Sequence, residues 1–519
     1  MPLLQIVLFL MLCAVALGWI ARHFNFPYPI ALVIGGAALG FGPYLPQFPF
    51  DPQLILVLVL PPILYQAALL TSWRDFKANI GPIGFLAIGL VIATTLAVAA
   101  IAKLLIPVMP WAAASALGAI VSPPDAVAAT AILSRLNIPR RVVTVLEGES
   151  LVNDASGLVL YNFAVAAVLT GTFSVVDAGV HFVVVAIGGI AVGVVLGRLF
   201  VFIHRHLGDA FIEVLMTLAV PYAVYILAES WHVSGVLAVV AAGLVRGRYS
   251  PEIVSAEMRI IARSVWNLLV FLLNSLVFIL IGIQLSGIVA RLAGYSAWQL
   301  MLYGALVSAV AIAVRFAWIY PATYLAHSLN ALVRAHQPMP KGEVFIMSWC
   351  GMRGIVSLAA ALALPITMEN EAPFPQRDLI IFLTFVVIAV TLVVQGLSLA
   401  PLIRRLKVGR DWSLQEEGQR AKFALGKAAI AAIDVLAVKE DIPDELAERI
   451  RAEFAEKITI GVPQGLVLSR GGADQARRLR EAAIKAERQE LLRIWRENQI
   501  SDDVLHQIEK DLDYQETRV

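Results

Sequence analysis

Charged residues and cysteines are both scarce in this chain. Only 15% of its 519 residues are charged and 59% are hydrophobic, whereas an average soluble domain carries about a quarter charged residues. A chain with so little charge cannot cover its surface in water, so lipid must be the solvent for most of it. The two cysteines, Cys13 and Cys350, lie in apolar stretches, and they cannot build a disulfide framework or a cysteine metal cluster.

Several functional signatures are missing as well. The net charge of +2 and the lack of a basic tail give no indication of nucleic-acid binding. No Gly-x-Ser-x-Gly or His-Glu-x-x-His motif occurs, which argues against an intramembrane hydrolase. No Thr-Val-Gly-Tyr-Gly filter and no repeated-arginine voltage sensor occurs, which argues against an ion channel. An enzyme and a channel are therefore the weaker interpretations.

Long apolar stretches, by contrast, recur along the first 405 residues. Because a helix needs about 20 residues to cross a bilayer, they predict about thirteen transmembrane helices in an all-α polytopic membrane protein. The first stretch lacks the basic start and small-residue exit of a cleaved signal, so we expect it to be retained. The predicted spans lie near residues 3–21, 28–42, 52–70, 81–106, 111–133, 143–170, 178–203, 211–229, 233–246, 265–288, 297–325, 343–367 and 378–403.

Basic residues are distributed unevenly between the loops that join these spans. When the loops are numbered alternately, one set carries nearly all of the lysine and arginine, and the other carries only Lys103, Arg291 and Arg377. Lysine and arginine are retained on the cytoplasmic side of a membrane. We therefore expect a multi-pass protein of the cell membrane with an odd number of spans, its amino terminus outside and its carboxyl terminus in the cytoplasm.

The composition changes after about Arg410, where much of the charge of the chain is concentrated. The stretches Asp444–Lys457 and Ala473–Arg496 combine helical spacing with mixed charge. We therefore expect residues 410–519 to form a helical cytoplasmic tail behind a transmembrane domain over residues 1–405. This tail is either a solvated appendage that stabilises the protein or supports a dimer, or a regulatory element.

The fifth predicted span contains the segment Ser122-Pro123-Pro124-Asp125. Proline has no backbone donor and blocks helical continuation, and backbone freed at membrane depth must be satisfied by protein, water or a cation. A loop between two short segments is the alternative, but neither Trp111–Val121 nor Ala126–Leu133 is long enough to span alone. The segment therefore predicts a broken helix with Asp125 at the break and Ser122 as a supporting residue.

The sixth predicted span contains a polar cluster of Glu147, Glu149, Ser150, Asn153 and Asp154. Residues four apart share a helix face, so Ser150 and Asp154 line one stripe and Glu149 and Asn153 the adjacent one. A carboxylate at bilayer depth is costly and marks an ion or proton path. With two acids near the centre, one can pair with a buried arginine while the other is functional.

The twelfth predicted span contains Arg353 between Gly351 and Gly354, which predicts a second helix break. A buried guanidinium needs an anion. Glu149 and Asp154 are the candidate partners of Arg353.

Two further polar residues lie in the last spans. Arg315 is either a second cation of the core or a packing residue with its head near the cytoplasmic side, and Gln395 could bond an interrupted helix. The two predicted breaks fall in the fifth and twelfth spans, one in each half of the chain. Paired interruptions of this kind indicate an inverted-repeat transporter with a site near the middle of the membrane.

The side chains at the breaks suggest exchange chemistry. Burial favours the protonated form of a carboxylate, and small hard cations prefer oxygen ligands, which Asp154, Asp125, Ser150 and carbonyls near Pro123 supply for Na⁺. A proton and a cation would compete for one carboxylate, and this yields exchange if the site alternates between faces and cannot cross empty. Asn153 offers an oxygen but no titratable charge, so the simplest cycle exchanges one proton for one monovalent cation without net charge movement.

Five segments together resemble the monovalent cation:proton antiporter-1 family, which includes bacterial and archaeal sodium/proton antiporters and the animal sodium/proton exchangers. They occur in the expected order within residues 1–405, and the Glu-Ser-Leu-x-Asn-Asp part of the third is the specific one. The segments are Leu60–Tyr65, Ser122–Val127, Glu147–Ala155, Gly351–Gly354 and Val394–Leu397.

The resemblance implies a fold, a site and a mode of action. The interrupted fifth and twelfth helices would cross beside Asp154, the essential ion- and proton-binding acid, with Asn153 and Ser150 next to it, and Glu149 would pair with Arg353. Members are homodimers that work by an elevator motion, exchange Na⁺ (and Li⁺) for H⁺, and use no cofactor. The dimerisation part would cover about 1–75 and 178–290, and the mobile core about 80–170 and 297–405.

The chain departs from the family pattern at two positions. Pro124 stands where many members have a threonine, which removes one side-chain oxygen from the ligand set. Gln66 stands where many members have an acid, which removes a titrating group. Sodium is the expected cation, and potassium, which the same acid can bind, is the alternative.

Overall fold

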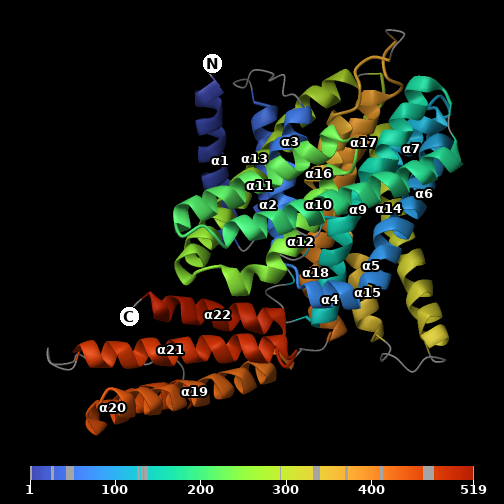
Figure 1. The fold of residues 1–519 in the computed structure, drawn as a ribbon. Helices are drawn as coiled ribbons and strands as arrows, with labels where there is room; N and C mark the ends of the chain where they lie inside the picture. Colours follow the sequence, from blue (N-terminus) through green and yellow to red (C-terminus); the bar gives the residue numbers. More distant parts are fainter. Residues whose placement is uncertain are drawn as a thin grey trace. The chain divides into compact units, whose positions relative to one another are not determined.

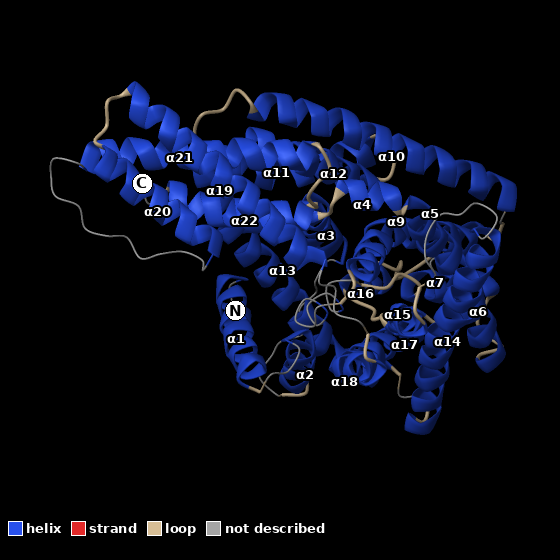
Figure 2. Cartoon of the chain, turned by 90° about the horizontal axis from the view of Figure 1, so that it is seen from below, coloured by secondary structure: helices blue, strands red, loops and turns tan. Residues whose placement is uncertain are grey.

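The computed structural model describes residues 3–24, 28–42, 52–125, 129, 133, 138–172, 174–292, 294–330, 339–368, 372–408, 413–459 and 473–517. Regular structure in these ranges is helical (Figure 1; Figure 2). The chain forms two compact units. The first comprises Met1–Phe202, Thr217–Arg248 and Trp266–Arg410, and the second comprises Ile203–Met216, Tyr249–Val265 and Asp411–Val519.

Apolar helices build the first unit, as expected for a chain whose backbone polar groups must be satisfied without water. Those wholly within it are α1 (Leu3–His23), α2 (Tyr28–Gly40), α3 (Pro52–Leu70), α4 (Trp73–Ala78), α5 (Ile80–Gly84), η1 (Phe85–Leu90), α6 (Val91–Leu105), α7 (Trp111–Val121), α9 (Arg140–Thr170), α14 (Ala297–Asn330), α15 (Lys341–Trp349), α16 (Ile355–Leu362), α17 (Arg377–Val390), η2 (Thr391–Gln395) and α18 (Gly396–Leu406). Helices with residues in both units are α10 (Val175–His204), α11 (Ala210–Ser230), α12 (Gly235–Ile253) and α13 (Ala256–Arg291).

The all-α membrane fold is confirmed, because helices overlap every predicted span. Length and composition do not count membrane crossings, so the number thirteen stays a prediction. Among the described residues, seven stretches are long and apolar enough to cross a bilayer: Ile80–Leu105, Arg140–Thr170, Val176–His204, Ala210–Ser230, Ala256–Arg291, Ala297–Thr323 and Arg377–Leu406. Four shorter apolar helices are Leu8–His23, Tyr28–Gly40, Val57–Leu70 and Trp111–Val121.

Both predicted helix breaks are present. Helix α7 ends at Val121, immediately before the proline pair, and most of the predicted continuation over 126–133 lies outside the described residues. The twelfth predicted span is divided into α15, which ends at Trp349, and α16, which begins at Ile355. Two polar interruptions in apolar helices were thus correctly predicted from proline and glycine.

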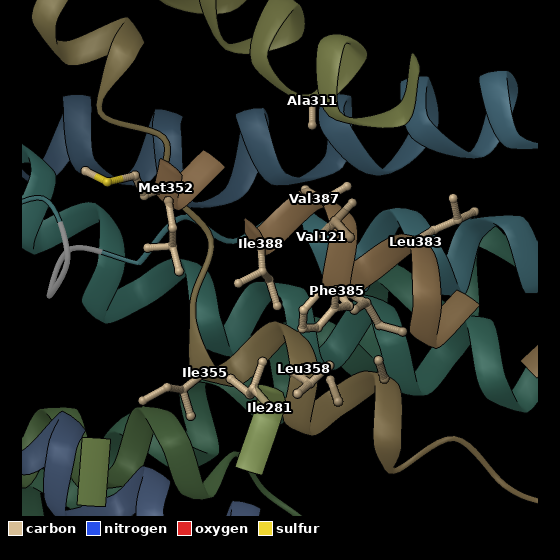
Figure 3. Packing of buried hydrophobic residues seen from close by; sticks show 14 of the residues in the cluster. Val121, Ile281, Ala311, Met352, Ile355, Leu358, Leu383, Phe385, Val387 and Ile388 are labelled. Carbon is tan, nitrogen blue, oxygen red and sulfur yellow. The ribbon is translucent and has the colours of Figure 1, made fainter. Parts of the chain in front are cut away.

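The breaks lie within one large apolar cluster. Figure 3 shows part of it, with Val121 from α7, Ala311 from α14, Met352 from the second break and Ile388 from α17. Each of these four side chains is almost fully buried. The polar groups of the breaks are therefore enclosed by apolar side chains, where an uncompensated charge is expensive.

Helices α2 and α13 approach each other so closely that only glycine fits between them. A Cβ atom at Gly282 would collide with the backbone of Val33 and Gly36 on α2. A Cβ at Gly36 would in turn collide with the backbone of Ile279 on α13. Small residues of this kind let membrane helices pack through their backbones.

We expect Gly282→Ala to lower the free energy of unfolding by about 1–3 kcal/mol, because the added methyl must push two backbones apart. Gly287→Ala is the matched control on the same helix, since its Cβ would meet only the flexible end of Arg291 at 3.6 Å. The control should be neutral or stabilise by up to about 1 kcal/mol through helix propensity. Thermal unfolding of the purified protein in detergent measures both, and equal effects would contradict the close packing.

The second unit contains the helices of the predicted tail. These are α19 (Ser413–Lys439), α20 (Asp444–Thr459), α21 (Ala473–Arg496) and α22 (Asp502–Glu516), so the helices predicted from charge patterning are confirmed. Ile433, Phe454 and Leu479 belong to one of its apolar clusters. Leu491 and Leu505 belong to another.

A buried ion network lies within this second unit. Arg259, near the start of α13, donates from Nε to Oδ2 of Asp513 at 2.9 Å and from Nη2 to Oδ1 at 2.5 Å. Arg488 donates to the same carboxylate at 2.9 Å, and Glu509 lies 3.3 Å from Arg259. Burial raises the pKa of Glu509, and Arg259 opposes that shift. Charges that compensate one another thus join α13, α21 and α22.

Candidate functional site

The two helix breaks meet in the interior of the first unit. The backbone N–H of Asp125 donates to the carbonyl of Met352 at 2.6 Å. The Nε of Arg353 donates to the carbonyl of Val121 at 3.0 Å. Each break therefore satisfies polar backbone that the other has released, which allows non-helical chain to persist among apolar helices.

Gly354 allows the Asp125 carboxylate to lie against the second break. A Cβ atom at Gly354 would overlap that carboxylate. Asp125 is partly exposed. Because glycine has no Cβ, the backbone of the second break at Gly354 can lie beside the Asp125 carboxylate of the first break.

Helix α9 places its central polar residues beside the first break. The Asn153 side chain is 0% exposed, and its Nδ2 donates to the carbonyl of Pro124 at 2.9 Å. Its Oδ1 is buried and accepts no hydrogen bond from the part of the chain that the structure describes. Asp154, the next residue, is 6% exposed. Asn153 thus fixes α9 against the break and leaves one amide oxygen available to a ligand.

Asp154 directly follows Asn153, whose amide bonds the carbonyl of Pro124, and Asp125 directly follows Pro124. Ser150 lies one helical turn before Asp154 and is partly buried. The structure therefore brings Asp125, Asn153 and Asp154 together at the first break, with Ser150 on the same stripe of α9 as Asp154. Two carboxylates, an amide oxygen and a hydroxyl are the hard donors that suit a small cation.

Ser122 has a structural role. Its side chain is 1% exposed, and its hydroxyl donates to the carbonyl of Ala119 at 3.0 Å. The Ser122 hydroxyl therefore helps to close the last turn of α7.

The partner of Glu149 differs from the sequence-based expectation. Glu149 pairs with Arg315, not with Arg353: Nη1 of Arg315 donates to Oε1 at 2.5 Å and Nη2 donates to Oε2 at 2.7 Å. Both side chains are 1% exposed, and the Nε of Arg315 also donates to the carbonyl of Met347 at 3.1 Å. The two hydrogen bonds engage both carboxylate oxygens of Glu149 with one guanidinium, which is a strong, bidentate form of ion pair.

Arg353 is satisfied by carbonyl groups instead of an acid. Besides the bond to Val121, its Nη2 donates to the carbonyl of Ala311 at 3.2 Å, and its Nη1 donates to that of Gly351. Its backbone N–H donates to the hydroxyl of Thr391 at 3.1 Å. Among the described contacts Arg353 forms no ion pair, and carbonyls of both breaks and of α14 accept its side-chain N–H groups.

Thr391 and the carbonyl of Ala311 were not identified from the sequence. Thr391 offered a signal, since it is a hydroxyl residue in an apolar span four positions before Gln395. A backbone carbonyl such as that of Ala311 leaves no signal in side-chain identity. Gln66, where the family often has an acid, donates to the Asn267 side chain at 3.5 Å.

Comparison with known proteins identifies the family. The family model described as "Sodium/hydrogen exchanger, transmembrane" matches residues 7–405. An uncharacterized Na(+)/H(+) exchanger of Mycobacterium bovis is 34% identical over 99% of this chain and 96% of its own length. A sodium, potassium, lithium and rubidium/H(+) antiporter of Bacillus pumilus is 30% identical over 93% of this chain and 73% of its own length.

A solved structure shares the fold. The sodium proton antiporter MjNhaP1 from Methanocaldococcus jannaschii aligns with a TM-score of 0.62 at 20% identity, over 78% of this chain and 99% of that one. The chain therefore belongs to the sodium/hydrogen exchanger family, and it is a membrane transporter, not an enzyme. The resemblance seen in the motifs is confirmed, and with it sodium/proton antiport at the level of the family, which uses no cofactor.

We expect a double-mutant cycle to separate the two arginines. Arg315→Met and Glu149→Gln should each lower the free energy of unfolding by about 3–5 kcal/mol, because each leaves a buried charge unpaired. Their double variant should lose much less than the sum, which denaturation in detergent can measure.

Arg353→Met provides the comparison. It removes bonds to carbonyls and no ion pair to Glu149, so its coupling to Glu149→Gln should be clearly smaller than that of Arg315→Met. Strong coupling between Glu149 and Arg353, with additive behaviour of Glu149 and Arg315, would contradict the observed pairing.

Proposed function

We propose that this chain exchanges sodium ions for protons across the membrane, and that Asp154 binds the cation and the proton in turn. The observation that carries the proposal is the position of Asp154: a buried acid beside two helix breaks, next to an amide oxygen with no hydrogen bond from the described residues. A carboxylate in such surroundings holds a charge well only when a cation or proton compensates it. Whichever ligand is bound excludes the other.

The other acid near the centre of α9, Glu149, already has a partner. Glu149 is compensated by Arg315 through two hydrogen bonds. It is therefore a structural charge and does not take part in the exchange. Asn153 contributes an oxygen without a proton, and Asp125, which is partly exposed, serves as a charged ligand together with Ser150. One exchanging acid supports an electroneutral cycle of one cation against one proton.

The range of cations follows from the same site. Sodium is the proposed substrate, with lithium as a smaller ion of the same charge. Potassium is the alternative, and it has specific support: the relative from Bacillus pumilus is named as an antiporter of sodium, potassium, lithium and rubidium. Pro124 supplies only a carbonyl where a threonine would add a hydroxyl, which favours a permissive ligand set.

Alternating access would come from an elevator motion of a homodimer. The proposed mobile core covers about 80–170 and 297–405 and holds both breaks, Asp154 and the Glu149–Arg315 pair. The proposed dimerisation part covers about 1–75 and 178–290 and holds the close α2–α13 contact. Most of the α10 surface is apolar and exposed, which suits contact with lipid or a second copy.

The proposed orientation places the amino terminus outside and the tail in the cytoplasm of a multi-pass cell-membrane protein. The uneven distribution of basic residues between alternate loops supports it. The tail helices carry mixed charge and form several exposed ion pairs, which suits an aqueous compartment.

Proteoliposomes with an internal pH-sensitive dye test the exchange. We expect sodium added to wild type under a pH gradient to collapse the gradient, and Asp154→Asn to abolish this response because the shared acid is lost.

Asp125→Asn should raise KM for sodium about tenfold or more, since a charged ligand is removed. Asp378→Asn, an aspartate whose 2.9 Å ion pair with Arg291 is largely exposed, is the matched control and should behave as wild type.

The outcomes discriminate between the candidate substrates. A response to potassium alone would keep the mechanism and change the substrate. An Asp154→Asn protein that exchanges like wild type would contradict the role of Asp154. A rate that depends on an imposed membrane potential would contradict electroneutral exchange.

A further inference from the structure

Gln395 is a buried amide that the fold does not use. Its side chain is 0% exposed, and neither Oε1 nor Nε2 has a hydrogen-bond partner among the residues that the structure describes. Among the described residues, Gln395 does not form the bond to an interrupted helix that the sequence suggested. A buried polar group without a partner destabilises a fold, so such a group calls for an explanation.

Neighbouring residues make the bonds that Gln395 does not. Thr391 accepts the backbone N–H of Arg353 at 3.1 Å, inside the second break. Ser398 accepts the indole N–H of Trp349 at 2.9 Å, at the end of α15. Gln395 lies between these two residues, four positions after Thr391 and three before Ser398. The stretch of helix that carries Gln395 therefore contacts the broken helix on both sides of it.

The local backbone also sets Gln395 apart. Residues Thr391–Gln395 form a π-helical turn, a rare arrangement that is frequently found at functional sites. The next residue, Gly396, faces Met352: a Cβ there would lie 3.6 Å from the Met352 sulfur. Met352 is the residue whose carbonyl accepts the Asp125 N–H. The turn that carries Gln395 thus lies beside the Met352 side chain, and its Thr391 hydroxyl bonds the backbone of Arg353 in the second break.

We propose that Gln395 is an additional ligand on the path of the transported cation, where its amide oxygen binds the cation or the amide binds one water that the cation carries. An amide oxygen is a hard, uncharged donor suited to a small monovalent cation. The inference rests on the proposed function and assigns a specificity-determining residue to it. A ligand that binds only during part of the cycle explains why the amide has no partner in the part of the chain that the structure describes.

Gln395→Met tests this role, because it keeps the length of the side chain and removes both polar atoms. We expect KM for sodium in proteoliposomes to rise about three- to tenfold, the effect of losing one hydrogen bond or ligand, with the maximal rate within about twofold of wild type. The Tm in sodium-free detergent should stay the same or rise, because an unpartnered buried amide is gone.

Thr384→Val is the matched control. Thr384 is also 0% exposed, its hydroxyl also has no partner among the described residues, and it lies on α17 of the same continuous helix. This isosteric change should leave KM for sodium at the wild-type value. A wild-type KM in Gln395→Met, or a lowered Tm with unchanged KM, would overturn the proposal and make Gln395 structural.

Two further measurements keep the test decisive. If Gln395→Met does not fold, Gln395→Glu retains an oxygen at the same position and should lower KM for sodium at alkaline pH; a wild-type KM there would overturn the proposal. The rise in Tm that sodium chloride causes reports cation binding without transport. It should be smaller in Gln395→Met than in wild type, and an equal rise would overturn the proposal even if wild type proves not to exchange sodium for protons.

Discussion

Glu149 and Arg315 form an ion pair at the centre of the first unit, with both side chains 1% exposed. The pair joins α9 to α14, and the bond from Arg315 to the carbonyl of Met347 adds α15. Removing either charge would leave the other buried and uncompensated, which protein interiors tolerate poorly. Because Arg315 compensates Glu149, Arg353 bonds carbonyls of the two breaks and of α14 instead, and Asp154 has no ion pair among the described contacts. The positions of both breaks and of Asp154 depend on that division.

Two polar side chains beside the breaks have buried atoms without a hydrogen-bond partner among the described residues. Asn153 Oδ1 is one such atom, and both amide atoms of Gln395 are others. Each lies on an element that contacts a break, α9 in one case and η2 in the other. A site filled completely by protein donors would leave no place for a cation, and a cation held by too many fixed ligands would not be released. Buried oxygens that lack a full set of hydrogen bonds therefore fit a site whose substrate must both bind and leave.

Sequence reasoning identified the elements of the site better than their pairing. The breaks could be predicted because proline and glycine interrupt a helix through their own backbone properties, which the sequence shows directly. The residues concerned are Pro123, Pro124, Gly351 and Gly354. The choice between Arg315 and Arg353 as the partner of Glu149 was different. Glu149 lies on α9, Arg315 on α14 and Arg353 in the second break, so only the three-dimensional packing decides which guanidinium meets the carboxylate. The bonds between the two breaks, which the carbonyls of Met352 and Val121 accept, could not be predicted either. Every residue has a backbone carbonyl, so the sequence does not show which carbonyl accepts a bond.

Calorimetry of cation binding in detergent tests the shared carboxylate most directly, without any need for transport. Sodium is titrated into the protein in buffers of different ionisation enthalpy, which gives the number of protons released for each cation bound. If Asp154 exchanges one ligand for the other, about one proton should be released per sodium ion near the pH where the acid is protonated, and Asp154→Asn should release none. Sodium binding without proton release, or equal release from Asp154→Asn, would contradict the central claim.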